Sequence, residues 1–186
     1  MYAEDPASGF LPSTGAIKLF TQPQGHGIRV DAGVETGDEV TPFYDAMVAK
    51  LITYGDTRED ARLKMRSALR GTALFGPENN RDFLIDVMDR DEFISGAATT
   101  AFIADNYGDA FTPAEISSAD LASAGAIQHV LAMETHHSQS ASVNKELLDW
   151  VSMGRVTDTK SYDVGEDARE VLLSLIHISE PTRRIL

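Results

Sequence analysis

The segment that most constrains the fold is YDAMVAKLITYG, at residues 44–55, because both faces of this extended chain would be mostly apolar. One face would carry Met47, Ala49, Leu51 and Thr53, and the other Val48, Lys50, Ile52 and Tyr54. A strand that is apolar on both faces is typical of the interior of a sheet. The sequence therefore predicts a central strand here, in which the charged Lys50 needs a partner.

An amphipathic helix is predicted directly after this segment, at TREDARLKMRSALRG (residues 57–71). Thr57 can cap the helix, and Asp60, three residues on, can complete a capping box. Apolar residues recur at helical spacing at Ala61, Met65, Ala68 and Leu69. Gly71 ends the pattern and marks the end of the helix.

Short β-rich runs at GAIKLFT (15–21) and HGIRVDAGV (26–34) flank a Pro/Gly turn signal, so we predict that they pair antiparallel. TALF (72–75) is a further short strand, and Asn80 can cap a helix that buries an apolar face. A third helix is predicted over 99–106, after a solvated helix end at 86–93. The expected class over residues 1–108 is α+β, a mostly antiparallel sheet with flanking helices.

A separate connecting region is expected over residues 109–173, partial and mainly helical. Thr112-Pro113-Ala114-Glu115 predicts a helix start that continues to about Thr135, and VNKELLDWVSMG (143–154) predicts another helix. The last 13 residues, SLIHISEPTRRIL (174–186), change character abruptly and resemble translated sequencing-adapter read-through. We expect them to be a non-native tail and exclude them from the fold.

The charge and hydropathy of the chain exclude several classes of function. A net charge of −13, with 29 acidic against 16 basic side chains, would repel a phosphate backbone, so we expect no nucleic-acid partner. No apolar run approaches the roughly 20 residues that span a bilayer, and no signal-peptide pattern follows Met1. We therefore expect no membrane association and a cytoplasmic protein, or a mitochondrial matrix protein in a eukaryote.

Three motifs in order, AEDPASGFLPSTG, GIRVDAGV and PFYDAMVAKLITYG, resemble the C-terminal subdomain of biotin carboxylase, as in the alpha subunits of acyl-CoA carboxylases. The resemblance covers residues 1–107. Residues 112–173 are weakly similar to the connecting region of those subunits. TALFGPENNRDFLIDVM (72–88) is closer to propionyl-, methylcrotonyl- or geranyl-CoA types than to acetyl-CoA systems.

This resemblance implies an ATP-dependent ligase that carboxylates biotin with bicarbonate. In the family an ATP-grasp domain precedes this region and binds ATP and Mg²⁺, so we expect an N-terminally truncated fragment, inactive alone. The implied partners are that missing ATP-grasp part, a biotin carboxyl carrier domain that bears the biotin, and a carboxyltransferase (beta) subunit. The resemblance also implies a homo-oligomer.

One catalytic residue follows from the resemblance, namely Arg29, in the family's strand GIRVD. Deprotonation of biotin at a ureido nitrogen moves negative charge onto the ureido oxygen, and an arginine aimed at that oxygen stabilises the charge. We therefore predict that Arg29 is catalytic and binds the biotin ureido oxygen. The alternative is a surface arginine paired with Asp31 or another acid, worth at most about 1 kcal/mol.

Other candidates receive lesser roles. Asp45 and Lys50 belong to the family motif YDxMxxK; a strand places them on opposite faces, so we expect structural or supporting roles. AMET (132–135) has Glu134 where a carrier domain has its biotinyl lysine, so we expect no biotin on this chain. Glu134 and His137 would share a helical face, but a di-metal bundle needs more ligands, so we predict no metal site.

Two further functions stay open. The first is a non-catalytic module that keeps the fold and serves protein association. The second is the equivalent region of a pyruvate or urea carboxylase, which shares these motifs. The first predicts a self-contained core, whereas a fragment should expose an apolar face where the missing domain packs.

Overall fold

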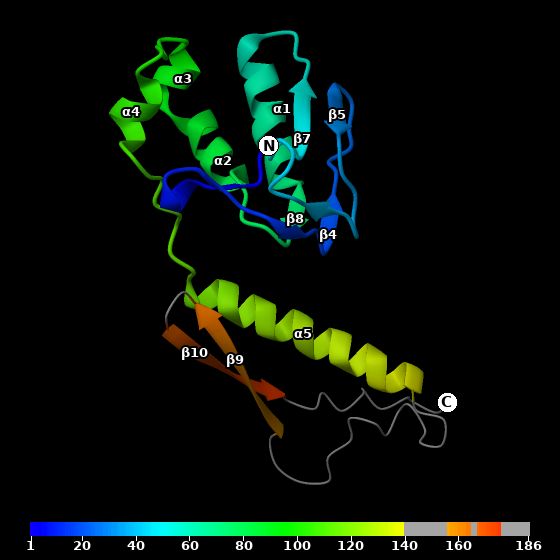
Figure 1. Ribbon diagram of the computed structural model, residues 1–186. Coiled ribbons are helices and arrows are strands. Elements are labelled where there is room, and N and C mark those ends of the chain that lie inside the picture. The colour runs from blue at the N-terminus through cyan, green and yellow to red at the C-terminus, as the bar shows by residue number, and fades with distance from the viewer. Residues whose placement is uncertain (140–155, 165–166, 176–186) are drawn as a thin grey trace, which may run out of the picture. The chain divides into compact units, whose positions relative to one another are not determined.

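The computed structural model describes residues 1–139, 156–164 and 167–175 (Figure 1). The chain divides into two compact units, Met1–Pro113 and Ala114–Leu186, and each is described by itself. The predicted helix at 143–154 lies outside the described residues, as do residues 176–186 of the predicted tail.

The first unit is an α+β fold, as predicted, in which short antiparallel strand pairs are flanked by helices. Its strands are β1 (Glu4–Asp5), β2 (Leu11–Pro12), β3 (Gly15–Ala16), β4 (Leu19–Thr21), β5 (Ile28–Ala32), β6 (Glu39–Val40), β7 (Ala49–Thr53) and β8 (Ala73–Phe75). Its α-helices are α1 (Arg58–Arg70), α2 (Arg81–Asp89), α3 (Asp91–Ser95) and α4 (Phe102–Tyr107), and a 3₁₀ turn spans Pro6–Ser8.

The predicted pairing of residues 15–21 with residues 26–34 is wrong. Instead β4 pairs with β8, β3 with β6 and β5 with β7, all antiparallel. The β4–β8 pairing sets Phe20 opposite Leu74, and both side chains are buried. Burial of this apolar pair accounts for the long-range partner, because the stabilisation grows with the apolar area removed from water.

The predicted central strand at residues 44–55 is also wrong. Among the described residues β7 pairs only with β5, and it begins at Ala49. Val48 lies just before it, in the core, where its backbone N–H donates to the carbonyl of Met1 at 3.0 Å. Ile52 and Tyr54 are 40% and 67% exposed, so the second apolar face of this segment is only partly buried.

Thr57 caps helix α1 as predicted, but Asp60 reaches back to Asp56 and not to the cap residue of the predicted capping box. The Thr57 hydroxyl accepts from the backbone N–H of Asp60 at 3.1 Å, while the Asp60 carboxylate accepts from the N–H of Asp56 at 3.2 Å. Gly55 allows the close approach of β7 to this helix, because a Cβ there would collide with the backbone nitrogen of Ala61. Figure 1 shows α1 beside β7, with β5 on the side of β7 away from the helix.

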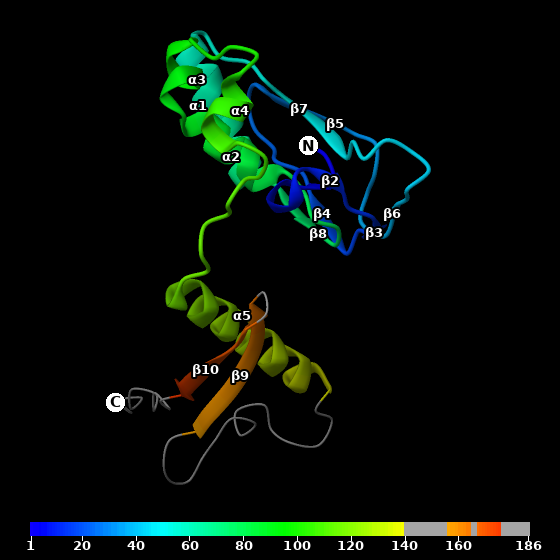
Figure 2. The ribbon, with the colours of Figure 1, turned by 60° about the vertical axis from the view of Figure 1, so that its left-hand side comes forward.

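Helix α2 starts after Asn80 and buries an apolar face, as predicted, through Phe83 and Val87. The predicted cap is wrong, because the Asn80 side chain makes no cap hydrogen bond. Residues 91–95, predicted as part of a solvated helix end, form the separate helix α3. Figure 2 shows α2, α3 and α4 grouped at one end of the unit. Two apolar clusters fill the unit: one joins the strands to α1 around Ile17, Val48 and Leu69, and the other joins α2 to α4.

The second unit consists of helix α5 (Ser118–Gln139) and an antiparallel hairpin of β9 (Val156–Val164) and β10 (Asp167–Leu175). The predicted helix start at 112–115 is wrong, because Ser117 and Asp120 supply the cap instead: the Asp120 N–H donates to the Ser117 hydroxyl at 3.2 Å. The hairpin was not predicted, and β10 includes the first two residues of the predicted tail.

Candidate functional site

Arg29 lies on the exposed face of the β5–β7 strand pair. The register sets Arg29 opposite Ile52 and Asp31 opposite Lys50, so these four side chains share one face. The other face carries half-buried Val30 and Leu51, which pack against the core. The alternation of apolar and polar residues along IRVDA thus places Arg29 outside while its neighbours anchor the strand.

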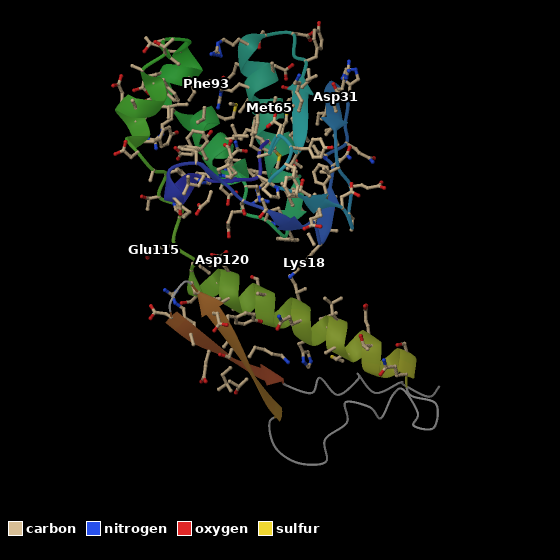
Figure 3. The ribbon with its side chains drawn as sticks, viewed as in Figure 1. Lys18, Asp31, Met65, Phe93, Glu115 and Asp120 are labelled. Carbon is tan, nitrogen blue, oxygen red and sulfur yellow. The ribbon has the colours of Figure 1, made fainter. Side chains whose placement is uncertain are left out.

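Arg29 and Asp31 form a two-point ion pair. The Arg29 Nε donates to Asp31 Oδ1 at 2.8 Å, and its Nη2 donates to Asp31 Oδ2 at 2.9 Å. The side chains are 72% and 45% exposed, respectively. Hydrogen bonding to Arg29 lowers the pKa of Asp31, with a smaller contribution from the Lys50 charge, and the same pairing raises the pKa of Arg29. Figure 3 labels Asp31 on β5, apart from Met65 in the interior.

Lys50 and Asp45 separate in the structure. Lys50 is exposed and lies across from Asp31 on the neighbouring strand, where its charge favours the ionised carboxylate. Asp45 precedes β7, and its carboxylate accepts from the backbone N–H of Met47 at 3.1 Å. The structure therefore brings Lys50 to the Arg29 face and gives Asp45 a role in a turn.

The nearness of Lys50 to the Arg29–Asp31 pair could not be seen in the sequence. Lys50 is 19 residues from Asp31, and only the register of β5 against β7 makes the two neighbours. The one local signal was the i,i+2 spacing of Arg29 and Asp31, which puts both side chains on one side of a strand.

Large apolar side chains are exposed in the same unit. Phe43 and Tyr44, in the loop before β7, are each 85% exposed. Leu19 and Phe75 are cross-strand neighbours on β4 and β8 and are 39% and 59% exposed. Adjacent exposed apolar side chains of this size are typical of surfaces that contact another protein or domain.

Neither a metal cluster nor a membrane span is found where the structure describes the chain. In those parts no three His, Cys, Asp or Glu side chains gather to hold a metal ion. Within the same residues, no helix has the length and apolar character needed to cross a bilayer.

Solved structures share this fold. The biotin carboxylase subunit of pyruvate carboxylase matches 56% of this chain with a TM-score of 0.55 and 40% identity. The biotin carboxylase domain dimer of Hydrogenobacter thermophilus 2-oxoglutarate carboxylase, solved with MgADP, ADP and bicarbonate, matches with the same TM-score and 39% identity. The chain covers 23% of each of these two structures.

Curated proteins with similar sequences are also biotin carboxylases or alpha chains of propionyl-CoA carboxylase. The biotin carboxylase of Halalkalibacterium halodurans is 47% identical over 103 residues, 55% of this chain and 23% of the relative. The propionyl-CoA carboxylase alpha chain of Ruegeria pomeroyi is 39% identical over 155 residues, 71% of this chain and 23% of the relative. This chain thus spans under a quarter of the length of either protein. The family model for the biotin carboxylase C-terminal domain matches residues 1–105. This chain belongs to the biotin carboxylase C-terminal domain family.

Proposed function

We propose that this chain forms one wall of the biotin pocket in the biotin carboxylase component of an acyl-CoA carboxylase, where Arg29 donates to the biotin ureido oxygen. The observation that carries the proposal is that the Arg29 guanidinium is exposed and paired at one edge only. Arg29 lies on an exposed strand face, and Asp31 accepts only from its Nε and Nη2, so the Nη1 donors are left for a carbonyl-type oxygen.

The proposed role of Arg29 is to stabilise negative charge on the ureido oxygen of biotin. When a ureido nitrogen of biotin loses its proton, negative charge develops on the ureido oxygen, and a cation already aimed there needs no rearrangement. An arginine stays protonated through this step, and pairing with Asp31 raises its pKa further. Arg29 therefore holds the charge without exchanging a proton.

The remaining machinery is proposed to lie in other parts of the protein. ATP, Mg²⁺ and bicarbonate would bind to an ATP-grasp region, and biotin would arrive on a carrier domain. We expect that the chain alone does not hydrolyse ATP in a biotin-dependent manner. The exposed Phe43 and Tyr44 support a contact with such a region.

The acyl-CoA carboxylase assignment is supported by how much of this chain one relative matches. The first unit holds 113 of the 186 residues, about 61%. The match to the Ruegeria propionyl-CoA carboxylase alpha chain covers 71% of the chain, so it must extend into the second unit. The match to the Halalkalibacterium biotin carboxylase covers 55%. We propose residues 109–173 as the connecting region of such an alpha chain, which works with a carboxyltransferase subunit in the cytoplasm or mitochondrial matrix.

The test is a chimera in which residues 1–105 of this chain replace the matching part of the Ruegeria alpha chain. Biotin-dependent ATP hydrolysis would be measured with free biotin. Arg29→Ala should lower kcat about 10²- to 10³-fold, as loss of an oxyanion donor does. Arg29→Lys keeps the charge but loses the fork, so we expect partial activity.

The matched control is Arg70→Ala, because Arg70 is an exposed arginine at the end of α1. This variant should keep full activity. If Arg29→Ala were as active as the unchanged chimera, Arg29 would revert to a surface ion-pair residue. The association module would then be the better reading.

A further inference from the structure

We infer that Asp31 is a positioning residue that holds the Arg29 guanidinium in the orientation needed for the ureido oxygen. This inference rests on the proposed function of Arg29. It adds a second functional residue, which acts on biotin only through Arg29.

The geometry of the pair supports this role. A guanidinium has five N–H donors, and a carboxylate that accepts from Nε and Nη2 fixes its plane. Asp31 binds that edge at 2.8 and 2.9 Å. Two of the five donors are thereby used, which leaves the two Nη1 donors and the second Nη2 donor for a ligand oxygen.

The pair has no role in joining elements of the fold, unlike other arginine–acid pairs of the same unit. Arg62 also donates to the carbonyl of Met88, and Arg81 to the carbonyl of Thr72. The hydrogen bonds of Arg29, within the described residues, go to Asp31 alone, two residues away on the same strand. An exposed pair of this kind adds little stability, so packing does not account for its two-point geometry.

Asp31 offsets the positive charge of Arg29, but Lys50 adds a second positive charge to the same face. It lies opposite Asp31 on β7, so the face carries two cations and one anion. The Lys50 charge also favours the ionised form of Asp31, which is the form that accepts both hydrogen bonds. The acid can therefore orient the guanidinium while the face keeps a net positive charge.

The experiment uses the same chimera and free biotin. Asp31→Asn places an amide NH₂ against one guanidinium donor, so the two-point contact is lost. We expect kcat to fall about tenfold, with the KM for ATP unchanged, because only the orientation of the Arg29 guanidinium changes. Asp31→Glu keeps both acceptor oxygens and should recover most of the loss.

Two further variants separate this inference from the proposed function. Asp82→Asn removes the exposed acid of the Arg81–Asp82 pair and should leave kcat unchanged. Arg29→Ala/Asp31→Asn should be no slower than Arg29→Ala, because Asp31 acts only through Arg29. If Arg29→Ala abolishes turnover while Asp31→Asn keeps it, the inference is wrong and the proposed function stands. If neither substitution matters, both are wrong.

A measurement on the chain itself needs no activity. The Nε–H of Arg29, observed by ¹⁵N NMR, should exchange with water about fivefold or more slowly in the unchanged chain than in Asp31→Asn, because the carboxylate shields it. Equal exchange rates would show that the ion pair does not order the guanidinium, which would overturn the inference.

Discussion

Asn80 is hydrogen bonded to the backbone of Tyr2, 78 residues earlier in the chain. Its Oδ1 accepts from the Tyr2 N–H at 2.9 Å, and its own backbone N–H donates to the Tyr2 carbonyl at 3.1 Å. Asn80 is 7% exposed. The residue predicted to cap α2 therefore joins the start of that helix to the first residues of the chain.

Replacing Asn80 by Ala should destabilise the first unit by about 1–3 kcal/mol, because the partly buried Tyr2 N–H would lose its acceptor. Asn80→Asp keeps an acceptor oxygen and should lose less. Urea unfolding, followed through the tyrosine near-ultraviolet signal, measures both. A loss within 0.5 kcal/mol for Ala, roughly the scatter of surface substitutions, would show that water replaces the amide.

Tyr107 ties α4 to α2, because its hydroxyl donates to Asp86 at 2.7 Å and accepts from Arg90 at 3.2 Å. Burial, reinforced by Asp86, raises the pKa of Tyr107 to about 12. The unfolded chain has a tyrosine pKa of about 10 and so releases this proton first as the pH rises. The stabilisation from Tyr107 is therefore complete below pH 10 and is lost between about pH 10 and 12.

Tyr107→Phe should cost about 1 kcal/mol at pH 8, through loss of the hydroxyl's hydrogen bonds. The variant should also lose part of the fall in unfolding free energy between pH 10 and 12. Tyr54→Phe, at an exposed tyrosine, is the control and should change neither quantity. An alkaline slope that is the same in Tyr107→Phe as in the unchanged chain would contradict the assignment.

Arg62 is a buried arginine that joins α1 to the end of α2. Its Nη1 donates to the Met88 carbonyl at 2.6 Å, and its Nε and Nη2 donate to Glu59 at 2.8 and 2.7 Å. Arg62→Met fills similar space but leaves the carbonyl without this donor. We expect a loss of about 1–3 kcal/mol in the free energy of unfolding.

Arg62→Lys separates the contribution of the positive charge from that of the guanidinium geometry. Lysine keeps the charge but cannot donate to Glu59 and to the Met88 carbonyl in the same way. This variant should fall between the unchanged chain and Arg62→Met, whereas Arg70→Met should have no effect. Thermal unfolding of the three variants gives the comparison. Equal stability of Arg62→Met and the unchanged chain would mean that apolar packing replaces the polar contacts.

The exposed apolar side chains predict that the purified chain binds a hydrophobic dye. Phe43 and Tyr44 are each 85% exposed, and a Phe43→Ser/Tyr44→Ser variant should lower dye fluorescence without a change in unfolding free energy. Absence of dye binding by the unchanged chain would instead favour a self-contained module.

Local features of the sequence predicted local structure well. The extent and cap of α1 follow from Thr57, Asp60 and the spacing of apolar residues, all within one 15-residue window. The buried face of α2 follows in the same way from Phe83 and Val87. Such patterns need no partner from elsewhere in the chain, because helix hydrogen bonds and caps join residues a few positions apart.

The candidate site was only partly accessible from the sequence. Arg29 was named through a resemblance, and Asp31 only as a nearby acid in the alternative interpretation of Arg29 as a surface ion-pair residue. The position of Lys50 came from the β5–β7 register alone. The pairing of β4 with β8, in place of β5, likewise depended on which alignment buries Phe20 beside Leu74.

By itself the sequence determined the family, the α+β class and helices α1 and α2, because motifs, caps and apolar spacing are properties of short stretches. Tertiary structure alone decided which strands pair, where Asn80 donates and accepts, and which charges surround Arg29. Lys50 is 19 positions from Asp31, and Asn80 is 78 positions from Tyr2. The geometry of these contacts depends on how the whole unit buries its apolar surface, since the short strands carry too little pattern to select a partner.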